Sequence, residues 1–155
     1  MNTVIDQYGQ ILLEAMGQTL LLALYGLLFA CILGLIFGML SVVKNKVCNV
    51  IAYIFVYAIR GVPMIVLAFF IFFGVPYLFN TIFEGLFAEK ITLTALQAGT
   101  VCLALNCGAY MSEIIRAGIQ SVDRGQMEAA RSLGMTYWRS MFKVVLPQAI
   151  RTMIP

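Results

Sequence analysis

Long apolar stretches alternate with short polar connections along the 155-residue chain. Residues 19–43 carry no charge, and this run of 25 residues is long enough for one tilted membrane-spanning helix. Residues 91–115 form a run of equal length with a single charge, Glu113, near the end. The pattern predicts an all-helical integral membrane protein, built as one domain over residues 1–155.

The middle apolar stretch is longer, residues 47–83, and carries one charge, Arg60. As one straight helix it would reach roughly 55 Å, well beyond a hydrocarbon core of about 30 Å. Helix-breaking residues interrupt it at four positions: Gly61, Pro63, Gly74 and Pro76. We therefore predict one span at about residues 48–75 with a break at Pro63. We expect residues 74–81 to leave the helix and run along the outer surface.

Small residues recur at every fourth position of the first stretch and form one helical stripe: Gly26, Ala30, Gly34 and Gly38. Such a stripe lets a neighbouring membrane helix approach closely, although chance recurrence in a glycine-rich helix is the alternative. The third stretch also has recurring small residues: Ala95, Gly99, Ala104 and Gly108. We expect the third span to pack against protein along that face.

The one long polar segment, residues 116–146, is also the most basic part of the chain. Within it, residues 124–133 are mostly good helix formers, and both ends of this run are marked. Asp123 can cap the first turn, with Gln126 three residues later as in a capping box. Gly134 follows the last helical residue, where glycine is favoured. The pattern predicts a short helix, either a docking element or a connecting helix on the membrane surface.

The positions of lysine and arginine predict the orientation, because these residues favour the cytoplasmic side. The first connection carries Lys44 and Lys46, whereas the second has only Lys90 beside Glu84 and Glu89. The third connection has five basic residues: Arg116, Arg124, Arg131, Arg139 and Lys143. We therefore expect the first and third connections in the cytoplasm and the N-terminus outside.

Beyond the basic loop the chain becomes apolar again at residues 147–155, which we interpret as the start of a fourth span. Tyr137 and Trp138 precede it where the chain approaches the inner membrane surface, a usual position for amphipathic rings. Four phenylalanines of the middle stretch are interpreted as lipid contact and helix packing: Phe69, Phe70, Phe72 and Phe73.

Composition excludes several classes of function. With 62% hydrophobic and 11% charged residues, the chain is too apolar for a soluble domain of this size, and a net charge of +3 gives no reason to expect nucleic acid. Histidine is absent, which removes the commonest metal ligand and general base, and no nucleotide-binding glycine loop is present. We expect no enzyme activity, metal or catalytic residue on this chain. The cysteines form no metal-binding spacing and are interpreted as packing residues: Cys31, Cys48, Cys102 and Cys107.

Arg60 and Glu113 are the ionisable residues placed most deeply in apolar sequence. A charge at membrane depth costs about 2.5–3.5 kcal/mol, so such residues usually pair or face an aqueous path. Three interpretations of Arg60 remain open. It can form an ion pair with Glu113, line a translocation path at the break made by Gly61 and Pro63, or extend to an interface. Glu113 can equally brace a gate near the cytoplasmic end.

The segment Glu128-Ala129-Ala130, with Gly134 after it, resembles the EAA loop of ABC importer permeases. Four blocks occur in the order of the polar-amino-acid branch of that family: residues 60–63, 70–76, 108–122 and 128–147. The resemblance covers most of the chain and implies a permease domain that typically has five spans. Residues 1–155 are therefore expected to form three full spans and the start of a fourth, an incomplete five-span domain.

The resemblance also implies a function, which is transport of polar amino acids into a bacterial cell across its inner membrane. It implies a second permease subunit (identical or similar), two cytoplasmic ATPase subunits that hold ATP and magnesium, and an extracytoplasmic amino-acid-binding protein. The short helix would couple to the ATPase through Glu128, Ala129, Ala130, Arg131 and Gly134. The alternative is a small helical membrane scaffold that recruits a cytosolic partner through its basic loop.

Overall fold

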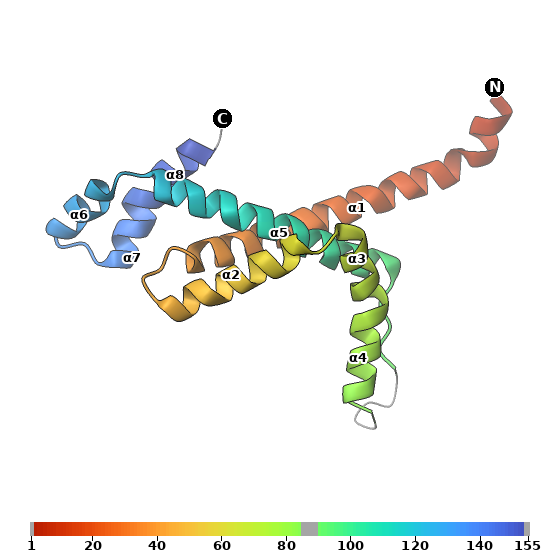
Figure 1. Cartoon of the computed structure of the whole chain (residues 1–155). Helices are drawn as coiled ribbons and strands as arrows, with labels where there is room; N and C mark the ends of the chain where they lie inside the picture. Colours follow the sequence, from red (N-terminus) through yellow and green to blue (C-terminus); the bar gives the residue numbers. More distant parts are fainter. Residues whose placement is uncertain (1, 85–89, 154–155) are drawn as a thin grey trace.

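A computed structural model describes residues 2–84 and 90–153, and within these ranges the chain forms helices and turns but no strand. The predicted all-helical fold is confirmed (Figure 1). The elements, in chain order, are α1 (Asn2–Leu40), α2 (Lys46–Gly61), α3 (Met64–Phe69), η1 (Phe70–Gly74), α4 (Val75–Ile82), α5 (Ala95–Ser121), α6 (Arg124–Ser132), α7 (Tyr137–Ser140), η2 (Met141–Val145) and α8 (Leu146–Met153). The elements η1 and η2 are short π-helices. Glu89 and residues 154–155, which the sequence analysis used, lie outside the described residues.

Three stretches of the described chain are long and apolar enough to cross a membrane: Tyr8–Leu40, Met64–Ile82 and Ala95–Ser121. The first begins well before residue 19. The third begins only after Thr94, whose hydroxyl accepts a hydrogen bond from the Gln97 backbone N–H in a complete capping box. The middle candidate is displaced toward the C-terminus from the expected 48–75.

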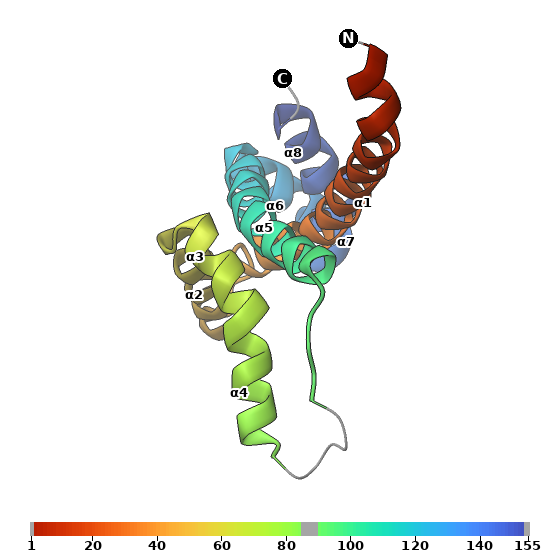
Figure 2. The same ribbon diagram turned by 90° about the vertical axis from the view of Figure 1, so that its right-hand side faces the viewer.

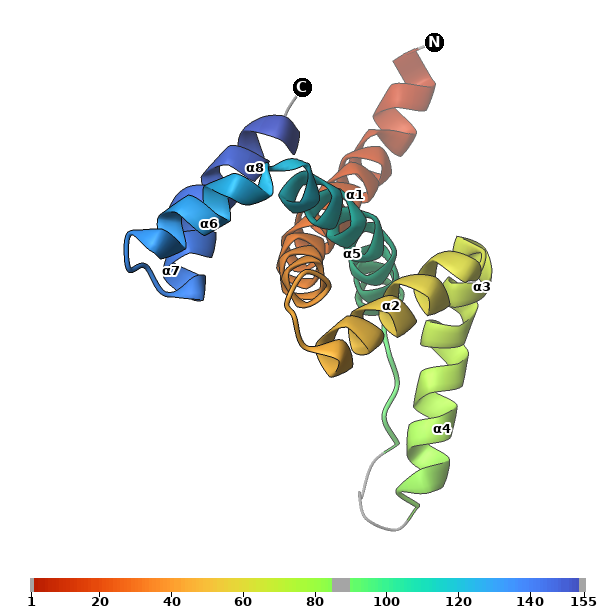
Figure 3. The ribbon, with the colours of Figure 1, turned by 60° about the vertical axis from the view of Figure 1, so that its left-hand side comes forward.

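The middle stretch differs from its prediction because only one of its two proline sites breaks the helix. α2 ends at Gly61, and Pro63 begins a new helix that runs in a different direction (Figure 3). The expectation that residues 74–81 leave the helix is wrong, because α4 continues to Ile82. Before Pro76, the Val75 N–H donates to the carbonyl of Phe70, five residues back. This wider π-turn lets the helix pass the proline ring without breaking.

The most extensive contact in the molecule joins α1 and α5. The small-residue stripe of α1 lies in this contact, where Ala30 is fully buried. A Cβ added to Gly34 would lie only 2.6 Å from the Met111 Cβ, and one added to Gly38 would lie 2.8 Å from the Ile115 Cβ. The two helices therefore approach to a distance that larger side chains on this stripe would prevent.

Small residues of α5 face α1 in return. A Cβ added to Gly108 would lie 3.0 Å from the Leu33 Cβ, and one added to Gly99 would lie 2.9 Å from the Leu22 Cδ1. Ala104 is buried as well, whereas Ala95, at the start of the helix, is exposed. Each helix therefore receives side chains of the other between its own small residues.

α5 lies between α1 on one side and α2–α3 on the other (Figure 2). On the α3 side, a buried cluster consists of Leu67, Ile71, Ala98 and Cys102, with Phe72 packed against it. The other phenylalanines of that region are exposed: Phe69, Phe70 and Phe73. These helices contribute to the core through one face and leave the opposite apolar face uncovered by this chain.

A second buried cluster joins the end of α5 to the C-terminal helices, and its members are Ile119, Met141, Val145 and Ala149. Gly118 provides the space in which the Met153 side chain lies. The Ser121 and Thr152 hydroxyls are 3.2 Å apart. α6, α7 and α8 are therefore grouped at one end of the α1–α5 pair (Figures 1 and 3).

Replacing Gly34 with alanine is expected to loosen the α1–α5 contact, because the new methyl group would meet the Cβ of Met111, which cannot swing away from its own backbone. Overpacking of this kind costs about 1–3 kcal/mol. The measurement is the midpoint of the thermal unfolding transition in detergent.

The matched control is Gly17→Ala on the same helix, where an added Cβ meets nothing within 4 Å. Its midpoint should stay unchanged or rise, since alanine favours the helix more than glycine does. Equal midpoints for Gly34→Ala and the unaltered chain would contradict this account of the contact.

Candidate functional site

α6 starts directly after α5 and is held at its first turn by its own sequence. The Asp123 carboxylate accepts a hydrogen bond from the Gly125 backbone N–H at 2.6 Å, so the predicted N-cap is confirmed. Gln126 was expected to complete a capping box, but its side-chain oxygen instead accepts a hydrogen bond from Gln148 at 3.2 Å. The tertiary contact with α8 therefore engages the side chain that the local motif would have used.

The other end of α6 closes with a Schellman motif. Gly134 has φ +81°, the left-handed conformation that glycine adopts at little cost. Its N–H donates to the Arg131 carbonyl at 3.0 Å, and the Met135 N–H donates to the Ala130 carbonyl at 3.3 Å. The predicted helix end at Gly134 is confirmed, and the chain turns sharply there toward α7.

The packing of α6 buries one of the two neighbouring alanines of the EAA segment and leaves the other exposed. Ala130 is only 5% exposed, because it faces the α7–η2 side, whereas Ala129 is exposed. The exposed surface of α6, which we call the α6 outer face, has two sides: Ala129 and Leu133 lie on one, and Glu128 and Arg131 lie on the other, where they line a cavity toward the α1–α2 connection. Leu133 is 85% exposed, an unusual position for a large apolar side chain. Ala130 therefore lets α6 approach its own chain, and Ala129 and Leu133 remain available to a partner.

α6 is supported from one side only. Met127 packs against the cluster of Ile119 and Met141, and Tyr137 packs there too. Burial raises the pKa of the Tyr137 hydroxyl. On another side, a cavity of about 860 Å³ separates α6 from the α1–α2 connection at Lys44. The helix is thus tied to α5 and η2 and free toward the solvent.

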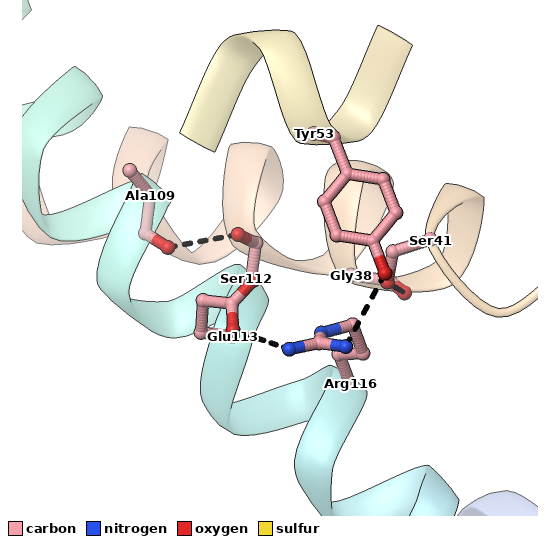
Figure 4. A network of polar contacts seen from close by, with 7 residues as sticks. All are labelled: Gly38, Ser41, Tyr53, Ala109, Ser112, Glu113 and Arg116. Carbon is pink, nitrogen blue, oxygen red and sulfur yellow. Dashed lines mark hydrogen bonds and ion pairs between the residues drawn. The ribbon is translucent and has the colours of Figure 1, made fainter. Parts of the chain in front are cut away.

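A second polar constellation joins α5 to α2 (Figure 4). Glu113 and Arg116 form an ion pair at 2.8 Å, one helical turn apart, and each side chain is 26% exposed. Arg116 also donates to the Tyr53 hydroxyl at 3.5 Å, and its guanidinium lies 5.7 Å from that ring centroid. Arg116 therefore connects the acidic residue of α5 to an aromatic side chain of α2.

Of the three interpretations of Arg60, the ion pair with Glu113 does not form in this structure, because Glu113 is paired with Arg116 on its own helix. The Arg60 guanidinium instead lies over the Tyr110 ring, 4.7 Å from its centroid, and the side chain is exposed. Arg60 is in the last turn of α2, directly before the break. In that break, the Pro63 carbonyl accepts hydrogen bonds from the backbone N–H groups of Val66 and Leu67.

Three residues of these sites were missed by the sequence analysis: Tyr53, Tyr110 and Leu133. The i,i+3 spacing of Glu113 and Arg116 was a visible signal for the ion pair. No local sequence signal indicates which tyrosine contacts which arginine, because each of the two pairs joins residues of different helices. Within the described ranges, no group of three or more His, Cys, Asp and Glu residues is placed to hold a metal ion.

The fold defines a helical integral membrane protein with a short capped helix, α6, projecting at one end and a polar network that joins α5 to α2. Residues 15–155 match the family described as the binding-protein-dependent transport system inner membrane component, and the chain belongs to this family.

Relatives of this family carry names that specify a transported solute. The chain is 44% identical over 97 residues to the "Probable glutamine ABC transporter permease protein GlnM" of Bacillus subtilis (strain 168), an alignment that covers 63% of this chain and 40% of that protein. It is 39% identical over 121 residues to the nopaline transport system permease protein NocM of Agrobacterium fabrum (strain C58), covering 76% of this chain and 48% of that protein. The aligned region is therefore less than half the length of either relative.

A solved structure has the same fold. It is described as the crystal structure of an amino acid ABC transporter with histidines, and it superimposes with a TM-score of 0.78 at 34% sequence identity. The superposition covers 99% of this chain and 66% of that chain.

Replacing Gly134 with valine is expected to loosen the end of α6, because a non-glycine residue in the left-handed region costs about 1–2 kcal/mol. The measurement is hydrogen–deuterium exchange of the α6 amides, which should lose protection. Gly134→Asn is the matched control, since asparagine tolerates this conformation and should retain most of the protection. Equal protection in the two variants would contradict the role of the turn.

Proposed function

We propose that this chain is a transmembrane permease subunit of an ABC importer that moves polar amino acids into the cell. Family membership and the names of the relatives support the transport class, and the amino acid transporter structure supports the substrate class. The observation that carries the proposal is α6, a capped helix held against α5 and η2 with an outer face open to a partner.

In this proposal α6 couples the permease to a separate ATPase subunit. Glu128 and Arg131 make polar contacts, Ala129 allows close approach, and Leu133 enters an apolar groove of the ATPase. Ala130 holds α6 against η2, and Gly134 sets the turn. Because α6 packs on α5 through Met127 and Ile119 and is hydrogen-bonded to α8 through Gln126, movement of the ATPase would move these helices together.

The proposed assembly contains two permease subunits, identical or similar, two cytoplasmic ATPase subunits that bind ATP and magnesium, and an extracytoplasmic amino-acid-binding protein. The basic connections at Lys44 and in residues 116–146 are in the cytoplasm in this proposal, and the N-terminus is outside, following the distribution of lysine and arginine. ATP hydrolysis takes place on the partner, and this chain provides the gate and the path.

The proposed path passes the break in the middle stretch, at Gly61 and Pro63. Arg60 lies roughly 20 Å from the start of α2, and Tyr110 lies roughly 16 Å from the end of α5, so both are near the middle of the membrane. Asn106 is one helical turn from Tyr110 on the same face of α5, half-buried. A cation, a phenol and an amide at this depth suit a zwitterionic solute, whose carboxylate Arg60 can bind at two points.

Toward the proposed cytoplasmic end, Glu113 and Arg116 tie α5 to α2 through Tyr53. We propose that this network braces the inner gate. It holds the two helices together in one state of the transporter, because separating them would leave the Arg116 guanidinium without its tyrosine contact.

Replacing Leu133 with alanine is expected to weaken ATPase binding. Complete burial of a leucine contributes about 1.5–3 kcal/mol, equivalent to roughly ten- to hundredfold in affinity. The measurement is the dissociation constant between the permease in nanodiscs and the purified ATPase subunit. The control is Leu24→Ala on α1, a leucine that is 65% exposed and distant from α6. An unchanged dissociation constant for Leu133→Ala would contradict the docking role.

Replacing Arg60 with glutamine is expected to raise KM for amino-acid uptake into proteoliposomes at least tenfold, because a charged two-point hydrogen bond contributes about 1.5–3 kcal/mol. Binding of the ATPase should stay unchanged, since Arg60 is in the last turn of α2, and that end of α2 is well separated from α6 (Figures 1 and 3). Lys90→Gln, which removes one positive charge from an exposed connection, is the control. Unchanged uptake kinetics for Arg60→Gln would remove Arg60 from the path and leave the coupling proposal intact.

A further inference from the structure

The segment α7–η2 buries one side and exposes the other. On the buried side, Ser140 is fully buried, and Met141 and Val145 are each 4% exposed. The exposed side, which we call the aromatic-basic face, consists of Trp138, Arg139, Phe142 and Lys143. Trp138 and Phe142 are 50% and 55% exposed. Two large rings and two cations therefore share one uncovered surface.

The rings of this face form a continuous apolar platform. Trp138 and Phe142 are stacked with their centroids 6.1 Å apart, and Tyr137 meets Trp138 edge-on at 5.6 Å. The cations beside them have no ionic partner in the part of the chain that the structure describes, where the recorded ion pair is Glu113–Arg116. The platform thus carries unneutralised positive charge and no acidic residue.

The face lies at the level where a membrane span ends. Met39 and Val42, at the end of the first candidate span, pack against the cluster that contains Met141. Lys44 of the α1–α2 connection and Tyr137 line the same cavity. Figure 1 accordingly places α7 and the α1–α2 connection at the same end of the α1–α5 pair. This is the level of lipid headgroups, where tryptophan and basic residues are favoured.

The α6 outer face and the aromatic-basic face are turned to different sides. α6 packs on the buried side of η2, through Met127, so a partner bound to α6 leaves the opposite side of α7–η2 uncovered. We propose that the aromatic-basic face binds an anionic phospholipid of the inner leaflet. The Trp138 and Phe142 rings enter the interface, and Arg139 and Lys143 bind the headgroup phosphate. The leaflet rests on the proposed orientation, but the lipid contact does not depend on transport.

Such a contact would hold α7 at the membrane surface while α6 moves. Gly134 separates α6 from α7, so lipid bound to α7 holds one side of this turn at the membrane surface while an ATPase moves the other. The angle between α6 and the membrane would then be set by the turn alone.

The test uses fluorescence, because Trp138 is the single tryptophan of the chain. The chain is placed in nanodiscs that contain the same small fraction of brominated phosphatidylglycerol or brominated phosphatidylcholine. We expect stronger quenching of Trp138 by the anionic lipid. Arg139→Gln/Lys143→Gln should remove the difference, with the relative affinity for the anionic lipid falling roughly fivefold per residue, the equivalent of about 1 kcal/mol each.

The matched control is Lys90→Gln/Arg124→Gln, which removes the same number of positive charges from exposed positions in the connection before α5 and on α6 and should keep the difference. Equal quenching by the two lipids, or a difference that survives Arg139→Gln/Lys143→Gln, would overturn the proposal. Absence of quenching by either lipid would overturn it too. Protection of Trp138 from acrylamide by added ATPase subunits would then assign the face to a protein partner. Because no uptake is measured, these outcomes are independent of the proposed transport function.

Discussion

Close packing of the α1 and α5 backbones is the interaction on which the other contacts of this molecule depend. In a bilayer, apolar side chains gain little by leaving lipid for another helix, so association relies on van der Waals contact and shape. Gly34 and Gly38 on α1, and Gly108 on α5, make that contact possible because a Cβ at each would meet its neighbour helix at 3.0 Å or less. With one side of α5 fixed in this way, its remaining sides position α2–α3 and α8.

Each π-helix of the described chain ends two residues before a proline. η1 precedes Pro76 and η2 precedes Pro147, and in each the residue before the proline donates to a carbonyl five residues back. The wider turn accommodates the ring, so the helix continues through α4 in one case and through α8 in the other. The continuity of the helix at Pro147 matters for the proposed coupling role of α6, because a helix that broke there would not transmit movement of α6 into the membrane.

The candidate coupling helix was predictable to the extent that it is local. Asp123 and Gly134 fix the ends of α6 through hydrogen bonds within a few residues, and such motifs are readable from sequence. Which alanine faces outward was not readable, because it depends on where η2 packs. The same limit applies to Arg60, whose neighbour Tyr110 belongs to a helix about fifty residues away in the chain. Glu113, by contrast, pairs within its own helix turn.

The sequence by itself determined that this is a helical membrane protein, which helix carries the small-residue stripe, and where the projecting helix begins and ends. These follow from hydrophobicity, spacing and caps, all of which act over a few turns. Only the tertiary structure decided that the helix continues through the proline at 76, and which side chains are left open to a partner. The first outcome depends on the π-turn η1 and its packing against α5, and the second depends on how α6 packs against η2. Both are properties of packed surfaces and not of any single stretch.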